Sequence, residues 1–310
     1  MECQLAWTRE LGHVTYDRLR QLNDPWHPLR AENSNRPMYV FDEDTQLTLR
    51  DEHVWTCAMS DRWNVGTVPN GGYVMSIASR ALSALLPHPD ILSLSGHYLL
   101  PARPGATELH GERIRVGGSA SMGMLRLVQD GQERARFLAT AGHFDEDGGV
   151  EDRHGCGPPA AIPALEACHR VPHKPTGSSS IASLLDTYHA PAASKWLRGE
   201  GPGEMISGGY IGFSDGREPD VTAFPLFCDA FPPTVFNALC QAAWVPTLQL
   251  NVQFRARPNP GLMRALFRTR HLTGGLHEED GELWDSQGTL TALSRQLARI
   301  RLPKRDQRPG

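Results

Sequence analysis

The segment GFSDG, with Ser214 at its centre, matches the GxSxG pattern that can expose a serine nucleophile on a tight turn. Asp220 or Asp229, then His271 or His277, follow it in the Ser, Asp, His order of the α/β-hydrolases. Such a turn needs a buried strand before the serine and a helix directly after it. Here the charged run DGREPD follows the serine, and no alternation of strands and helices surrounds it. Serine hydrolysis is therefore an alternative interpretation, which Ser214→Ala tests.

The run HEED, from His277 to Asp280, is a second group of chemically active side chains. Carboxylates and an imidazole can bind a metal, but this run lacks the helical HExxH spacing of zinc hydrolases. We expect it to be a solvated acidic turn between two strands. The sequence therefore predicts no metal and no other cofactor.

The elements that position these residues come from a chain of 310 residues, 40% of them hydrophobic and 21% charged, as in globular proteins. No apolar run reaches the roughly 20 residues of a membrane span. The net charge of −4 provides no basic stripe for nucleic acid. The N-terminus lacks the apolar stretch of a secretion signal, and the six cysteines show no CxxC spacing. We therefore expect reduced thiols and a cytoplasmic location.

Alternating and helical patterns succeed each other along the first half of the chain. Residues 41–63 have the alternation and charged turn of a β-hairpin. Apolar residues at four-residue steps then predict a helix over about 72–86, which Pro87 closes. Three strand candidates follow between residues 91 and 144. A curved antiparallel sheet wrapped around one helix is the expected structure.

A connector rich in Pro, Gly and Ser interrupts this pattern, with at most a short helix near residues 181–188. We expect the following division of the chain: an N-terminal extension over 1–37, a first domain over 38–145, the connector over 146–203, a second domain over 204–304 and a tail over 305–310.

The second half repeats the first. The tripeptide Ala-Arg-Pro begins at Ala102 and again at Ala256, an offset of 154 residues, and the turns ending at Gly131 and Gly288 are offset by 157. The second helix is expected over 232–244, because two prolines suit a helix start. The expected fold class is α+β: a double hot-dog of two antiparallel sheets, each wrapped around a central helix and fused as a pseudo-dimer.

In the order of its motifs the sequence resembles the acyl-CoA thioesterase II type of double hot-dog protein and the broader thioesterase-like group. Four segments carry the resemblance: Trp63 with VGTVPNGGY, HYLLPARPG, DGREPDVTAFPLFCDAFPPTVFN and LWDSQGTLTALSRQLARIR. It covers about residues 41–303, excluding the connector. It implies hydrolysis of an acyl-CoA or acyl-carrier thioester without a covalent intermediate.

The resemblance also implies a catalytic set. In that family an Asp, a Thr and a Gln hold the attacking water, and the matching residues look like Asp229, Thr247 and Gln296. Asp229, just before the second helix, would be the general base. Taken singly, Asp229 could cap the helix after it, Thr247 could be an ordinary strand residue, and Gln296 could face solvent. The functional interpretation depends on their joint occurrence.

Backbone N–H groups of Gly72 and Tyr73, at the start of the first helix, are the expected oxyanion donors, because a helix N-terminus presents unpaired donors and the positive end of its dipole. Gly71 and Gly72 lack side chains and would let a thioester approach closely. These three residues form the predicted substrate-binding set.

The repeat predicts one catalytic site per chain. An offset of 157 carries Gln296 back to Ala139, which cannot orient a water, and an offset of 154 carries Thr247 back to Ser93. A non-catalytic acyl-binding role, with a vestigial polar set, stays open beside hydrolysis. The fold is also compatible with a homodimer of double hot-dog chains.

Overall fold

The computed structural model describes residues 38–144, 162–173 and 181–302. The predicted N-terminal extension (1–37) and the tail (305–310) lie outside the described residues. None of the helices within the described part is long and apolar enough to span a membrane.

The long helix α3 (Gly71–Leu85) is the centre of the fold, and 11 of its 15 residues are buried. Its first turn is capped by Asn70, whose side-chain oxygen accepts the N–H of Tyr73 at 2.9 Å. Leu86 has extended backbone and Pro87 follows, so the helix ends there. The helix predicted over 72–86 is confirmed, shifted by one residue.

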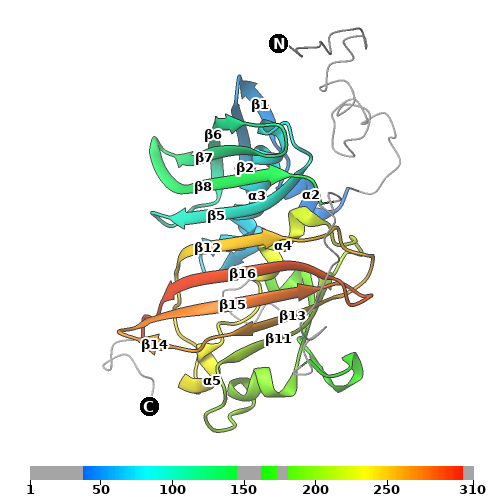
Figure 1. The fold of residues 1–310 in the computed structure, drawn as a ribbon. Coiled ribbons are helices and arrows are strands. Elements are labelled where there is room, and N and C mark those ends of the chain that lie inside the picture. The colour runs from blue at the N-terminus through cyan, green and yellow to red at the C-terminus, as the bar shows by residue number, and fades with distance from the viewer. Residues whose placement is uncertain (1–37, 145–161, 174–180, 303–310) are drawn as a thin grey trace, which may run out of the picture. The chain divides into compact units, whose positions relative to one another are not determined.

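Strands of both halves form one antiparallel sheet, with α3 and α4 on one face (Figure 1). Among the described residues the order is β1-β2-β6-β7-β8-β5-β12-β16-β15-β13-β11-β10-β9, and β14 pairs with β15. The strands that precede the connector are β1 (Thr48–Asp51), β2 (Val54–Met59), β5 (Asp90–Tyr98), β6 (Gly105–Val116), β7 (Ser121–Gln129) and β8 (Gln132–Gly142). The later strands are β9 (His169–Arg170), β10 (Leu185–His189), β11 (Ile206–Phe213), β12 (Thr247–Phe254), β13 (Met263–Arg268), β14 (Leu272–Thr273), β15 (Leu276–Trp284) and β16 (Leu290–Arg299).

The remaining elements are short. They are α2 (Val40–Asp44), the separate strand pair β3 (Asn64–Val65) and β4 (Val68–Pro69), α4 (Phe224–Cys228) and α5 (Val235–Leu239), and the 3-10 turns η2 (Asp61–Trp63), η3 (Leu165–Ala167), η4 (Ile181–Ser183), η5 (Pro191–Arg198) and η6 (Val221–Ala223). The hot-dog fold class is confirmed, because a large antiparallel sheet covers α3.

The halves meet edge to edge at the β5–β12 pair, where the Asn251 side chain donates to Ser95 Oγ at 2.6 Å. The internal repeat is visible in the strand register. Leu94 pairs with Ala139 between β5 and β8, and Leu250 pairs with Gln296 between β12 and β16. The β5–β8 pair has a bulge near the start of β5, and the β12–β16 pair has one near the start of β12. Equivalent residues are thus offset by 156 in β5 and β12, and by 157 in β8 and β16.

The second helix was predicted at the wrong place. Within residues 232–244 only α5 is helical, and Cys240, with a φ of 55°, ends it. The helix that packs against α3 is the five-residue α4, which carries Pro225 in its first turn. A proline favours the start of a helix at either position, and α4 is too short to show helical periodicity.

Three further predictions need correction. Residues 181–188 form the turn η4 and the strand β10 instead of a helix. The HEED run lies inside β15, where alternate residues are buried, so it is not a solvated turn. The hairpin predicted over 41–63 exists as β1 and β2, but its first residues form α2.

A buried aromatic and ionic cluster links α2 to the turn after β11. Trp63 is fully buried, stacks on Tyr73 with ring centroids 5.6 Å apart, and therefore packs in the core rather than binding ligand. Asp42 of α2 accepts Arg80 of α3 at 2.7 Å and Arg217 at 2.9 Å. A buried network of this kind is costly to break, because each partner left alone would be an uncompensated charge.

Candidate active site

The three side chains Asp229, Thr247 and Gln296 form one hydrogen-bonded chain. The Gln296 amide donates to Asp229 Oδ1 at 2.6 Å and to Thr247 Oγ1 at 2.8 Å. Gln296 is 8% exposed, because in the alternating strand β16 it faces the helices while Arg295 and Leu297 face outward. The alternative that Gln296 faces solvent is therefore wrong.

Asp229 ends helix α4 as its C-cap residue, instead of preceding a helix as predicted. Its carboxylate lies at the N-terminus of α3, in the other half of the chain. Oδ2 accepts the backbone N–H of Gly72 at 2.9 Å and the side-chain amide of Asn70 at 2.9 Å. The Asn70 amide also donates to the Asp229 backbone carbonyl at 2.8 Å. Asp229 therefore occupies an anion site made by the first turn of α3.

Two opposing influences set the pKa of Asp229. Burial raises it, and the hydrogen bonds from Gly72, Gln296, Gly71 and Asn70 lower it, with a net rise from 3.8 to about 6. At neutral pH the group is thus ionised, but it is a stronger base than a solvated aspartate.

A side chain at Gly71 and a side chain at Gly72 would meet different neighbours. A Cβ at Gly72 would lie 2.2 Å from the Pro225 carbonyl oxygen, so glycine is required there by the contact between α3 and α4. A Cβ at Gly71 would lie 3.1 Å from Asp229 Oδ2 and 3.3 Å from the Tyr98 ring. A side chain at Gly71 would therefore crowd both the Asp229 carboxylate and the Tyr98 ring.

The predicted oxyanion donors are already engaged in this structure. The Tyr73 N–H donates to Asn70 Oδ1 and the Gly72 N–H to Asp229 Oδ2. The expectation that both N–H groups are unpaired is wrong, since Asn70 and Asp229 satisfy the first turn of α3.

Two site residues were missed from the sequence. Asn70 caps α3 and also donates a hydrogen bond to Asp229. Tyr98, at the end of β5, donates its hydroxyl to the Gly71 carbonyl at 2.7 Å and so fixes the start of α3. An Asn directly before a helix is a recognisable capping signal, but the bond to Asp229 spans 159 residues and leaves no local trace.

The equivalent position in the first half lacks the polar set. Ala139 is the register counterpart of Gln296, as predicted. The counterpart of Thr247 is Ile91 instead of Ser93, since Ile91 pairs with Ala141 as Thr247 pairs with Ala298. Neither Ala139 nor Ile91 can hold a water.

The serine-hydrolase geometry is absent. The Ser214 hydroxyl donates to the Ser183 carbonyl at 3.1 Å, and a turn at Gly216, with a φ of 79°, follows instead of a helix. Asp220 caps η6 and pairs with Arg217 at 2.6 Å. In the part of the chain that the structure describes, no group of His, Cys, Asp or Glu residues has the arrangement of a metal site.

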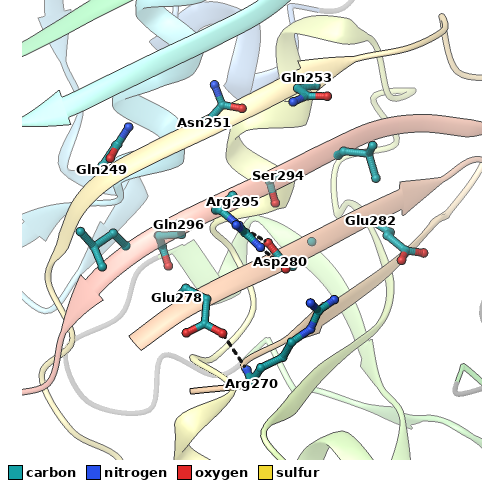
Figure 2. Close-up of a pocket in the computed structure, with 13 residues that line it drawn as sticks. Gln249, Asn251, Gln253, Arg270, Glu278, Asp280, Glu282, Ser294, Arg295 and Gln296 are labelled. Carbon is teal, nitrogen blue, oxygen red and sulfur yellow. Dashed lines mark hydrogen bonds and ion pairs between the residues drawn. The ribbon is translucent and has the colours of Figure 1, made fainter. Parts of the chain in front are cut away.

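A polar hollow lies on the opposite face of the same strands, as Figure 2 shows. Gln249, Asn251 and Gln253 follow β12 there, and Arg295 of β16 pairs with Asp280 of β15 at 2.5 Å. Gln296 also borders this hollow, but its amide donates to Asp229 and Thr247, whereas the charged side chains of the hollow, such as Arg295, lie on the other face of the sheet. The hollow is therefore not the candidate site.

Comparison with known proteins matches both halves of the chain to one family. The model of the acyl-CoA thioesterase N-terminal domain matches residues 59–142, and that of the C-terminal domain matches residues 165–300. A crystal structure assigned as a thioesterase II from Thermobifida fusca YX has 28% identity and a TM-score of 0.78, covering 86% of this chain and 99% of that one.

Two more distant structures share the fold. A hot-dog protein of unknown function from Alicyclobacillus acidocaldarius has 19% identity and a TM-score of 0.76, covering 86% of this chain and 100% of that one. The acyl-CoA thioesterase II TesB2 from Mycobacterium marinum has 18% identity and a TM-score of 0.65, covering 86% and 99%.

Proposed function

This chain belongs to the acyl-CoA thioesterase family, and on that premise we propose that it hydrolyses an acyl-CoA thioester by direct attack of water. The observation that carries the proposal is the hydrogen-bonded set of Asp229, Gln296 and Thr247 at the N-terminus of α3. These groups supply a base and polar partners for a water, which are the requirements of thioester hydrolysis.

Asp229 is the general base of this proposal. A pKa of about 6 keeps it ionised at neutral pH and close enough to neutrality to accept a proton efficiently. Thr247 Oγ1 accepts the Gln296 amide, so its own hydrogen can be donated to the water oxygen. The water proton passes to Asp229, and the water oxygen bonds to the thioester carbon. The C–S bond then breaks, and the leaving sulfur takes that proton back from Asp229, so that a free acid and a thiol are released.

The thioester is proposed to approach along Gly71, beside the first turn of α3. When Asp229 accepts the proton, its oxygens become weaker acceptors, and the Gly72 N–H can turn to the developing oxyanion. The Tyr73 N–H keeps its hydrogen bond to the Asn70 side chain and so stabilises the first turn of α3. The three residues of the predicted substrate-binding set thus keep a proposed role, in which only Gly72 is a direct donor.

The test is thiol release from acyl-CoAs of short, medium and long chain, compared with the same acyl groups on a carrier protein. We expect turnover of at least one acyl-CoA, and Ser214→Ala to retain wild-type kcat/KM. Saturable binding of every acyl-CoA without thiol release would instead support the accessory binding role. Loss of activity in Ser214→Ala would revive the serine mechanism.

A further inference from the structure

Glu279 is a second buried carboxyl beside the catalytic set, and no step above uses it. It lies on β15, is 7% exposed, and accepts the backbone N–H of Thr234 at 2.9 Å. Its register partner on β16 is Gln296. Side chains directly opposite in an antiparallel pair have Cβ atoms about 5 Å apart, and both residues are on the buried face. Glu279 therefore neighbours the amide that contacts Asp229.

The groups that face Glu279 offer it no positive charge among the described residues. His277 lies two residues earlier on the same face of β15 and is 1% exposed. Its ring contacts Thr269 at 3.3 Å, and Thr269 contacts Thr234 at 2.7 Å. Burial lowers the pKa of His277, so the imidazole is neutral near pH 7. On the side of α4 the charged group is Asp229, a like charge.

We propose that Glu279 is a positioning residue that acts through Asp229: the two carboxyls share one buried compartment and lose their protons one after the other, Asp229 before Glu279. The proposal rests on the proposed function, in which Asp229 is the base. Its physical basis is that a second negative charge in a poorly solvated site is opposed by the first, so the two groups titrate as a pair.

The order of ionisation follows from the surroundings of each carboxyl. Burial first, and also the charge of Asp229, raise the pKa of Glu279 to about 7, against about 6 for Asp229. Asp229 has several donors to its carboxylate and ionises first. Ionisation of Glu279 at higher pH then strengthens Asp229 as a base, because the added charge favours proton uptake.

The chain offers a matched control in the neighbouring residue. Glu278 lies on the opposite face of β15 and accepts the backbone N–H groups of Arg270 at 2.9 Å and His271 at 3.1 Å. Glu279→Gln keeps an oxygen for the Thr234 N–H and removes the charge, and Glu278→Gln makes the same change outside the site.

The first experiment follows the side-chain carboxyl carbons by NMR over pH in the free protein, and so needs no activity. In Asp229→Asn we expect Glu279 to titrate at a lower pH than in the wild type, because the opposing charge is gone. In Glu278→Gln it should titrate as in the wild type. An unchanged Glu279 titration in Asp229→Asn, or a wild-type value near the 4.3 of a solvated glutamate, would overturn the proposal.

The second experiment is the pH dependence of kcat/KM. We expect a rise in two steps in the wild type and in Glu278→Gln, and in one step in Glu279→Gln. A uniform loss of activity in Glu279→Gln with an unchanged profile would show a merely structural role and contradict the coupling. If no thioester is hydrolysed, the proposed function fails while the NMR titration still decides whether the carboxyls are coupled.

Discussion

At the scale of single residues, Asp229 shows how a carboxylate is kept ionised and basic at once. Burial alone would protonate it at neutral pH. The amides of Asn70, Gly72 and Gln296 donate to it at 2.6 to 2.9 Å and hold the charged form. The balance gives a pKa of about 6, so the activity of the wild type should fall as the pH drops through that value.

Gln296 is expected to act on both the water and the base. Gln296→Ala removes the amide that joins Asp229 to Thr247, and we expect kcat/KM to fall by roughly a hundredfold, the scale of a misplaced reactant. Because this amide lowers the pKa of Asp229, the acid limb of the pH profile should move to higher pH.

The control for this prediction is Gln249→Ala, which removes an amide from the outer hollow on β12. It should leave kcat/KM and the acid limb as they are. An acid limb that stays in place in Gln296→Ala would show that this amide does not stabilise the charged form of Asp229.

The sequence predicted the catalytic set only through its resemblance to a family. Taken singly, each member had an ordinary explanation, and Gln296 in particular could have faced solvent. That explanation is wrong because the alternate residues of β16 that face the helices include Gln296, which is therefore buried. Which face of β16 is buried depends on its pairing with β12 and β15, and the local sequence does not predict which face of a strand packs against the helices.

At the scale of elements, the site depends on the contact between α3 and α4. The Gly72 position leaves no room for a side chain next to Pro225, and this closeness brings the end of α4 to the N-terminus of α3. The sequence predicted α3 because its periodicity extends over several turns. It could not predict α4, whose five residues from Phe224 to Cys228 are held by packing rather than by pattern.

Asn70 connects helix stability to the site, and two substitutions separate these effects. Asn70→Ser keeps a capping oxygen for the Tyr73 N–H but loses the amide that donates to Asp229. We expect nearly wild-type thermal stability, a lower kcat/KM and an acid limb at higher pH. Asn70→Ala loses the cap as well and should be less stable by about 1 kcal/mol.

The measurements are thermal unfolding and the pH dependence of kcat/KM for both variants. Equal unfolding temperatures in Asn70→Ser and Asn70→Ala would show that the cap contributes nothing. An acid limb unmoved in both would remove Asn70 from the electrostatics of Asp229.

Strand register explains why the repeat predicted the wrong counterpart of Thr247. The Ala-Arg-Pro anchors, offset by 154, lie beyond the ends of β5 and β12, where the intervening loops have changed length. Inside the strands the offset is 156, which moves the counterpart of Thr247 from Ser93 to Ile91. A bulge lies between Ile91 and Ser93, so Ile91 is buried on the same face as Leu94, whereas Ser93 lies on the other face. The predicted loss of polarity therefore rests on Ala139 and Ile91.

At the scale of the whole molecule, neither half contains the site alone. Asn70, Gly71 and Tyr98 come from the first half, and Asp229 and Gln296 from the second. The β5–β12 pair joins both halves in one sheet. We propose the domains to be residues 38–145 and 204–304 with one catalytic site between them. The cytoplasmic location and the homodimer stay predictions.

Buried carboxyls also make the stability of the molecule depend on pH. The pKa of Asp229 is raised by folding, so its contribution to stability is fully present below pH 3.8 and is lost as the pH rises through about 6. Asp229→Asn has no such loss. We therefore expect the unfolding temperature of this variant, relative to the wild type, to increase between acidic and neutral pH.

Thermal unfolding by circular dichroism across this range checks the prediction, with Asp280→Asn as a control from the exposed face of β15. The pKa of Asp280 is lowered by its hydrogen bond to Arg295, so this substitution should change stability in the opposite sense. A difference between Asp229→Asn and the wild type that stays constant with pH would mean that Asp229 is not titrating in the range proposed.

The most direct measurement is kcat/KM for thiol release by Asp229→Asn on the best acyl-CoA at neutral pH, beside the wild type and Asp280→Asn. Loss of a general base is predicted to lower the value by roughly a hundredfold or more, mainly through kcat, while Asp280→Asn stays near the wild type. An Asp229→Asn enzyme that hydrolyses the thioester at the wild-type rate would contradict the role of Asp229 and the water-activation mechanism with it.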